Sequence, residues 1–143
     1  MILLDANLLV YAHAPESPHH KAARAWLEHV LNDPAKVGFP WPTLLGFARL
    51  MGNPHVAQKP IPLHRAWTRV ESWLALPQAW IPTPTDRHRK ILADLLAEES
   101  RPDLAADAHL AALAIEHGLT VCSTDGDFAR FRGVRWENPL RRD

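Results

Sequence analysis

Short apolar runs alternate with longer segments of helical periodicity along this chain. The first run, residues 1–4, ends at Asp5 and has the pattern of a buried strand. Similar runs predict further strands at residues 37–39, 79–81, 119–122 and 134–136. Because short strands alternate with helices, we expect an α/β fold with three layers, in which helices cover both faces of a short, mostly parallel central sheet.

The segments between these runs repeat apolar residues at helical spacing. They predict helices at residues 8–12, from 17 onward, and at 43–51, 63–76, 86–98 and 107–115. In the second helix we expect one face to carry Ala22, Ala25, Trp26, His29 and Val30.

The last predicted helix has the clearest signals. Residues 100–103 have the spacing of a capping box, with Asp103 in place of the usual glutamate, and the helix stops at Gly118. Its residues are small and apolar on most sides, so we expect it to be buried on more than one face.

Composition indicates a globular protein. The length of 143 residues fits one domain, residues 1–143, and 47% of residues are hydrophobic and 22% charged. The net charge of zero gives no bulk basic signal for nucleic acid, and a single cysteine, Cys122, excludes an internal disulfide. No apolar run reaches the roughly 18 residues of a membrane span, and Asp5 interrupts any secretory signal, so we expect a cytoplasmic protein with no membrane partner.

Carboxylates follow two of the predicted strands. Asp5 comes after the first strand, and Asp125 and Asp127 come after the fourth. Sites in open parallel sheets form at the carboxyl ends of the strands, so these groups are expected to meet. Asp107 lies in the helix before the fourth strand, among apolar neighbours where an unpaired charge is costly. Asp103, by contrast, fits a helix cap.

Carboxylates that are drawn together repel one another unless a cation neutralises them. Oxygen ligands favour Mg²⁺ or Mn²⁺ over zinc. Such a cation activates water and holds a phosphate, so the residues by themselves indicate divalent-metal phosphodiester chemistry.

Three motifs in order, residues 5–7, 107–114 and 123–128, resemble the signature of PIN-domain ribonucleases, and in particular the VapC toxins of bacterial toxin–antitoxin pairs. The resemblance covers the whole chain, and residues 41–50 and 131–140 add features of a subgroup. It implies a single PIN-like domain that cleaves RNA as the toxin of such a pair.

The resemblance also implies roles for individual residues. Asp5, Asp107 and Asp125 match the acidic residues that bind Mg²⁺ (or Mn²⁺), and Asp127 matches a supporting catalytic member. Asn7 matches the polar residue that orients the first aspartate. The loop hydroxyls that accompany the third aspartate are Ser123 and Thr124.

The chain departs from the family pattern in one helix. Many PIN domains place a glutamate in the segment that corresponds to residues 43–51, which here has no acidic residue; Gly46 and Arg49 lie where it is expected. Arg49 is a candidate RNA contact, with an ion pair as the alternative. Arginines near the C-terminus are expected in a solvated tail, with an RNA-phosphate rim beside the third aspartate as the alternative: Arg130, Arg132, Arg135, Arg141 and Arg142.

Three functions remain open at this point. The first is a metal-dependent endoribonuclease, and the second is a catalytically weak or inactive PIN-fold module that binds RNA or protein. The third, a phosphohydrolase with an aspartyl nucleophile, ranks last because Asn7 occupies the place of its second aspartate.

The resemblance implies two protein partners, a second copy of the chain and a small antitoxin. We expect helices within residues 43–76 to supply much of that surface, because the region between Phe39 and Trp80 is rich in large apolar groups: Trp41, Leu44, Leu45, Phe47, Leu50, Met51, Trp67 and Trp73. An antitoxin arginine directed at Asp5 and Asp107 would displace the metal.

Overall fold

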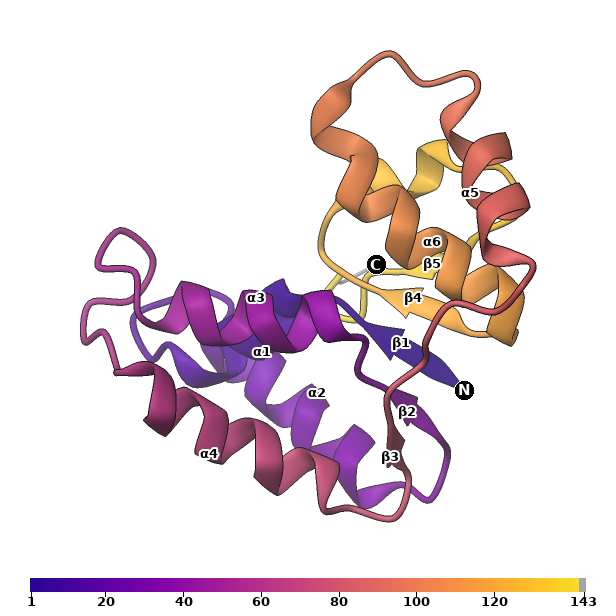
Figure 1. Cartoon of the computed structure of the whole chain (residues 1–143). Helices are drawn as coiled ribbons and strands as arrows, with labels where there is room; N and C mark the ends of the chain where they lie inside the picture. Colours follow the sequence, from indigo (N-terminus) through magenta and orange to yellow (C-terminus); the bar gives the residue numbers. More distant parts are fainter. Residues whose placement is uncertain (142–143) are drawn as a thin grey trace.

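The computed structural model describes residues 1–141, so Arg142 lies outside the described residues. Within them the chain forms one five-stranded sheet in which every neighbouring pair of strands is parallel (Figure 1). The strand order is β3-β2-β1-β4-β5. The strands are β1 (Ile2–Leu4), β2 (Val37–Gly38), β3 (Ala79–Trp80), β4 (Thr120–Cys122) and β5 (Arg135–Glu137).

Helices connect the strands and lie on both sides of the sheet (Figure 1). They are α1 (Ala6–His13), α2 (His20–Asn32), α3 (Trp41–Met51), α4 (Leu63–Leu74), α5 (His88–Leu96) and α6 (Ala105–His117), with two short 3-10 helices, η1 (Pro102–Leu104) and η2 (Gly126–Arg130). In the described part of the chain, none of these helices has the length and apolar character needed to span a bilayer.

The sheet separates two apolar cores. Leu4 and Cys122 point into a cluster formed with α1, α2, α3 and α4, whereas Leu3 and Val121 point into a cluster formed with α6 and η2. Successive residues of a strand face opposite sides, so β1 and β4 each supply both cores. This arrangement confirms the predicted three-layer α/β/α fold with a short parallel sheet.

The buried face of α2 differs from the prediction. Ala23, Leu27 and Val30 are buried, while Ala22 and Ala25 are exposed. The helix begins at His20, three residues after Ser17, because the Ser17 hydroxyl accepts a hydrogen bond from the His19 backbone N–H and closes a turn before the helix. The predicted buried face was therefore wrong for Ala22, Ala25 and His29. It was correct for Val30, and Trp26 is half-buried.

The predicted capping box was also wrong. The Asp103 carboxylate accepts hydrogen bonds from the Arg101 guanidinium, with a shortest distance of 2.6 Å, and residues 102–104 form η1. The end of α6 is as predicted, because Gly118 has a left-handed backbone with φ 69°. Six residues of α6 are buried, as its composition predicts: Ala108, Leu110, Ala111, Ala112, Leu113 and Ala114.

Candidate active site

The strand order brings the carboxyl ends of β1 and β4 together near the centre of the sheet. Leu4 lies opposite Cys122, so the chain leaves both strands side by side at Asp5 and Ser123. In the sheet, β2 and β3 lie on one side of β1, and β4 and β5 lie on its other side. The order of the strands thus reverses between β1 and β4, and α/β sheets bind ligands at the carboxyl ends of the strands at such a switch point. Because α6 leads into β4 through one turn at Gly118, its first turn, with Asp107, lies at the same edge (Figure 1).

The Ser123 hydroxyl connects three parts of the site. This side chain is fully buried and donates a hydrogen bond to Asp5 Oδ2 at 2.7 Å. Its oxygen accepts from Asn7 Nδ2 at 3.2 Å and from the Asp125 backbone N–H at 3.0 Å. The hydrogen bonds thus connect Asn7 to Asp5 through Ser123. This hydroxyl sets the position of Asp5 relative to the loop after β4.

Asp5 is held at the beginning of α1. Its Oδ1 accepts a hydrogen bond from the Ala6 backbone N–H at 2.8 Å, as an N-cap residue does. Burial raises the pKa of the Asp5 carboxyl, and the charge of Asp125 adds to the effect, while the hydrogen bonds from Ser123 and Ala6 oppose it. The net result is a carboxyl group that ionises less readily than an exposed aspartate.

Asp107 is the most strongly perturbed of the aspartates. Its pKa is raised from 3.8 to about 7, first by burial and then by the charges of Asp5, Asp125 and Asp127. A hydrogen bond with Asp125 raises the pKa of Asp107 further. The site thus has more negative charge than its surroundings stabilise.

Three of the carboxylates can share one cation. Asp107, Asp125 and Asp127 each present an oxygen atom, and these atoms all lie within 4.8 Å of one another. The metal ligands predicted from the sequence were Asp5, Asp107 and Asp125, so this group differs from them by containing Asp127 in place of Asp5. Asp5 lies beside the group and is connected to Asp125 through hydrogen bonds with Ser123. Only oxygen donors meet here, and the buried Asn7 Oδ1 beside them has no hydrogen-bond partner within the described residues. These donors fit a hard cation such as Mg²⁺ or Mn²⁺.

Arg101 contacts the cluster and was missed from the sequence. Its Nη1 and Nη2 donate to the two oxygens of Asp127 at 3.2 and 3.3 Å. The pair is separated by 26 residues, and no local pattern relates the two positions. The sequence position of Arg101, two residues before Asp103, could have predicted the Arg101–Asp103 ion pair but not the contact with Asp127.

Two other predicted residues make no polar side-chain contact with the four aspartates within the described part of the chain. Across residues 1–141 the Thr124 hydroxyl makes no hydrogen bond with them, and Arg49 forms no ion pair with them. Arg49 is exposed on α3 and lines a cavity of about 300 Å³ that α3 forms with α4. Gly46, by contrast, faces the start of α1, since a Cβ atom there would be 3.3 Å from that of Ala6. Position 46, which packs against the start of α1, thus carries no side chain.

A buried chain of polar groups was also missed, and it lies between α5 and α6. Glu116 Oε2 contacts His88 Nδ1 at 2.6 Å, and His88 Nε2 contacts His109 Nδ1 at 3.0 Å. His109 points away from Asp107, as its position two residues further along the helix predicts. This chain fixes α5 on α6, the helix that carries Asp107.

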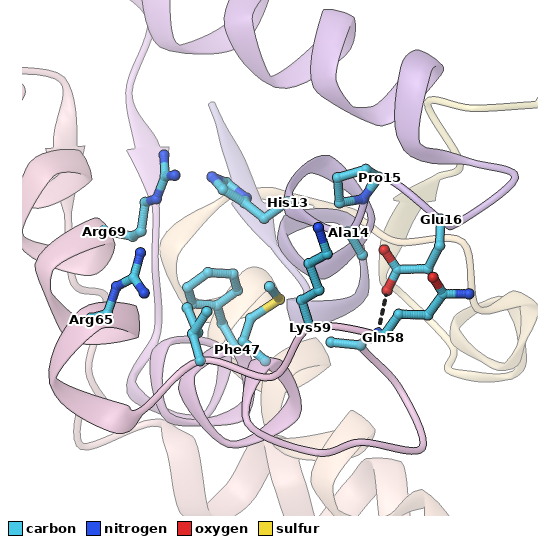
Figure 2. Close-up of a pocket in the computed structure, with 12 residues that line it drawn as sticks. His13, Ala14, Pro15, Glu16, Phe47, Gln58, Lys59, Arg65 and Arg69 are labelled. Carbon is cyan, nitrogen blue, oxygen red and sulfur yellow. Dashed lines mark hydrogen bonds between the residues drawn. The ribbon is translucent and has the colours of Figure 1, made fainter.

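One cavity of the structure lies away from the four aspartates. It has a volume of about 450 Å³ and lies between the end of α1, the segment after α3, and α4 (Figure 2). None of the four aspartates lines it.

The sequence profile of the PIN domain matches residues 2–134. The chain belongs to the PIN domain family. This PIN domain is 45% identical over 140 residues to Ribonuclease VapC37 of Mycobacterium tuberculosis, with 97% of each chain covered. Its fold is similar to that of FitAcB from Neisseria gonorrhoeae, with a TM-score of 0.68, 25% identity and coverage of 97% and 98%. It is also similar to VapC20 of M. tuberculosis, a toxin that cleaves the sarcin–ricin loop, with a TM-score of 0.68, 18% identity and coverage of 94% and 99%. These findings confirm the resemblance to the VapC group of PIN-domain ribonucleases.

We expect the metal-free PIN domain to lose stability as pH rises, because of Asp107. Its pKa is about 7 in the folded chain against 3.8 for an ordinary aspartate, so between these values the folded state holds a proton that the unfolded state has released. The stabilisation is complete below about pH 4 and is lost as pH rises through about 7. Allowing for solvent screening of a half-exposed group, the loss is about 1–2 kcal/mol.

Urea unfolding in EDTA at pH 5 and pH 8 tests this expectation. Asp107→Asn should be more stable than the wild type at pH 8, and the difference should shrink at pH 5. A difference between the two proteins that stays constant with pH would contradict the assigned repulsion.

Proposed function

We propose that this PIN domain is a VapC-type endoribonuclease, the toxin of a toxin–antitoxin pair, and that it hydrolyses RNA with the help of Mg²⁺ or Mn²⁺. The observation that supports this most directly is the meeting of Asp5, Asp107, Asp125 and Asp127 at the switch point of the sheet. The raised pKa of Asp107 supports the same assignment, because strongly perturbed carboxyl groups cluster at functional sites.

The proposed roles follow from the contacts. Asp107, Asp125 and Asp127 hold the cation, and Asp5 completes the negative site beside them. When bound, the cation supplies an activated water and neutralises charge on the phosphodiester. Ser123 holds the Asp5 carboxylate by its hydrogen bond, and Asn7 holds Ser123 in turn. Asp107 gives up its proton when the cation enters, since a cation favours the ionised form.

The second copy of the chain is proposed to bind an apolar patch on α3 and α4. The patch consists of Trp41, Leu45, Leu63 and Trp67, where Leu45 is 57% and Leu63 is 68% exposed and the two indole rings stack with centroids 6.3 Å apart. Homodimer interfaces are more apolar than other protein surfaces, so this patch suits an identical partner. Four of the other apolar residues expected at an interface are buried in the core: Leu44, Phe47, Met51 and Trp73.

The antitoxin is proposed to bind the cavity shown in Figure 2. Its lining includes the cationic side chains of Lys59, Arg65 and Arg69 and the apolar side chains of Phe47 and Met51. Within the described residues, these three cations form no ion pair, while the Glu16 carboxylate accepts a hydrogen bond from the Gln58 backbone N–H. An antitoxin segment with acidic and apolar side chains matches this lining.

We predict that Asp5→Asn and Asp107→Asn each lower RNA cleavage by about 100-fold or more, because either change weakens the hold on the cation. Cleavage of a structured RNA in Mg²⁺, circular dichroism and Mn²⁺ calorimetry measure activity, fold and metal binding separately. The matched control is Asp94→Asn, which removes an exposed carboxylate paired with Lys90 on α5.

Two outcomes would contradict the proposed nuclease. The first is a wild type that binds Mn²⁺ but cleaves no RNA, the result expected of an inactive binding module. The second is an Asp5→Asn or Asp107→Asn variant that cleaves as fast as the wild type at saturating Mg²⁺.

Leu45→Asp should convert a dimer into a monomer, because a carboxylate would be buried in the centre of the apolar patch. Light scattering at micromolar concentration measures the mass. Leu96→Asp is the control, since Leu96 is an exposed leucine, at 38%, on the distant helix α5. A monomeric wild type, or a dimer that survives Leu45→Asp, would overturn this interface.

Growth arrest in a bacterial host tests the antitoxin cavity. A fragment of the source genome that rescues cells expressing the wild type is selected first. The double variant Arg65→Glu/Arg69→Glu should still arrest growth but escape rescue by that fragment, because acidic side chains would then repel it. Arg87→Glu/Arg89→Glu makes the same charge change beside and on α5 and should remain rescued; rescue of both variants would refute the cavity as the binding site.

A further inference from the structure

Arg101 lies at the rim of the acidic cluster and bridges two carboxylates. Besides its two contacts with Asp127, its Nε donates to Asp103 Oδ1 at 3.3 Å and its Nη2 to Asp103 Oδ2 at 2.6 Å. The Arg101 side chain remains 42% exposed despite these contacts. It is therefore a cation within reach of both the cluster and the solvent.

The contact with Asp127 concerns the metal directly. Asp127 is one of the three carboxylates that can share a cation, yet both of its oxygens already accept from Arg101. A guanidinium and a divalent cation that use the same carboxylate compete, because each supplies the positive charge that the other would neutralise. In the absence of metal, Arg101 partly neutralises the negative charge of Asp127.

The neighbouring arginine shows that this contact is specific. Arg130 makes three hydrogen bonds with Glu99, at 2.7, 3.0 and 3.2 Å, and within the described residues it makes none with Asp127. Of these two rim arginines, only Arg101 touches a residue of the acidic cluster.

We propose that Arg101 is a positioning residue that exchanges partners: it holds Asp127 in the metal-free protein and moves to a backbone phosphate of the RNA when the metal takes Asp127. The proposal rests on the proposed nuclease function of this site. An arginine fork fits a phosphate as well as it fits a carboxylate, and the exposed rim position lets a long side chain turn from one to the other.

Metal binding without RNA tests the first half. Calorimetric titration with Mn²⁺ should show that Arg101→Ala binds the ion about three- to tenfold more tightly than the wild type, because a competing cation is gone. Arg130→Ala is the matched control, since it removes an equal charge nearby that does not contact Asp127. Its effect on Mn²⁺ affinity should be clearly smaller.

Steady-state cleavage at saturating Mg²⁺ tests the second half. Arg101→Ala should raise KM about tenfold, as expected for the loss of one charge-assisted phosphate contact, and should leave kcat unchanged. Arg101→Lys should recover part of the KM, because it retains the charge but not the fork.

The outcomes separate this proposal from the function on which it rests. Mn²⁺ affinity that is equal or weaker in Arg101→Ala would overturn the competition, and an unchanged KM would overturn the exchange even if the ion bound more tightly. A wild type that binds no Mn²⁺ and cleaves no RNA would instead refute the nuclease function. Tighter Mn²⁺ binding together with a raised KM would support the exchange.

Discussion

One buried hydroxyl group holds the candidate site together. Ser123 lies at the end of β4 and donates to Asp5 at the end of β1, while its own oxygen receives hydrogen bonds from Asn7 and the Asp125 backbone. The backbone around it is equally constrained, since its carbonyl accepts from the Trp136 indole and its N–H donates to the Glu137 carbonyl of β5. A buried polar group with all its partners is rigid, and losing one leaves the others unsatisfied at a cost of about 1–3 kcal/mol. The relative positions of the carboxylates therefore depend on the pairing of three adjacent strands.

Electrostatic repulsion is the cost of this arrangement. Four aspartates approach one another where burial already disfavours charge, and the raised Asp107 pKa records the result. The protein offsets part of the cost with backbone N–H groups at Asp5 and Asp125, with the proton on Asp107, and with the Arg101 guanidinium. Each of these groups supplies positive charge that a bound divalent cation would also supply. A site built in this way is less stable empty than filled, which is the expected relation between a metal centre and the fold that supports it.

The two faces of the sheet have different tasks. On one face, α5 and α6 are joined by the chain of Glu116, His88 and His109, and they hold Asp107 in place. On the other face, α3 and α4 present the apolar patch of Trp41, Leu45, Leu63 and Trp67 and, beside α1, the cationic cavity. The proposed protein partners thus bind on elements that do not carry Asp107, Asp125 or Asp127. Asp5, between β1 and α1, connects these elements to the acidic site.

The sequence by itself determined the strands, the α/β class, the end of α6 at Gly118 and the family, because these depend on local periodicity, glycine conformation and motifs that stay in order along the chain. It also indicated the four aspartates, since parallel strands carry their sites at their carboxyl ends. Tertiary structure decided what local patterns cannot contain. The buried face of α2 depends on where the preceding turn ends, and Asp103 pairs with Arg101 because η1 replaces the capping box. The contact of Arg101 with Asp127 and the role of Ser123 join residues 26 and 118 positions apart, and only the folded sheet brings such groups within hydrogen-bond distance.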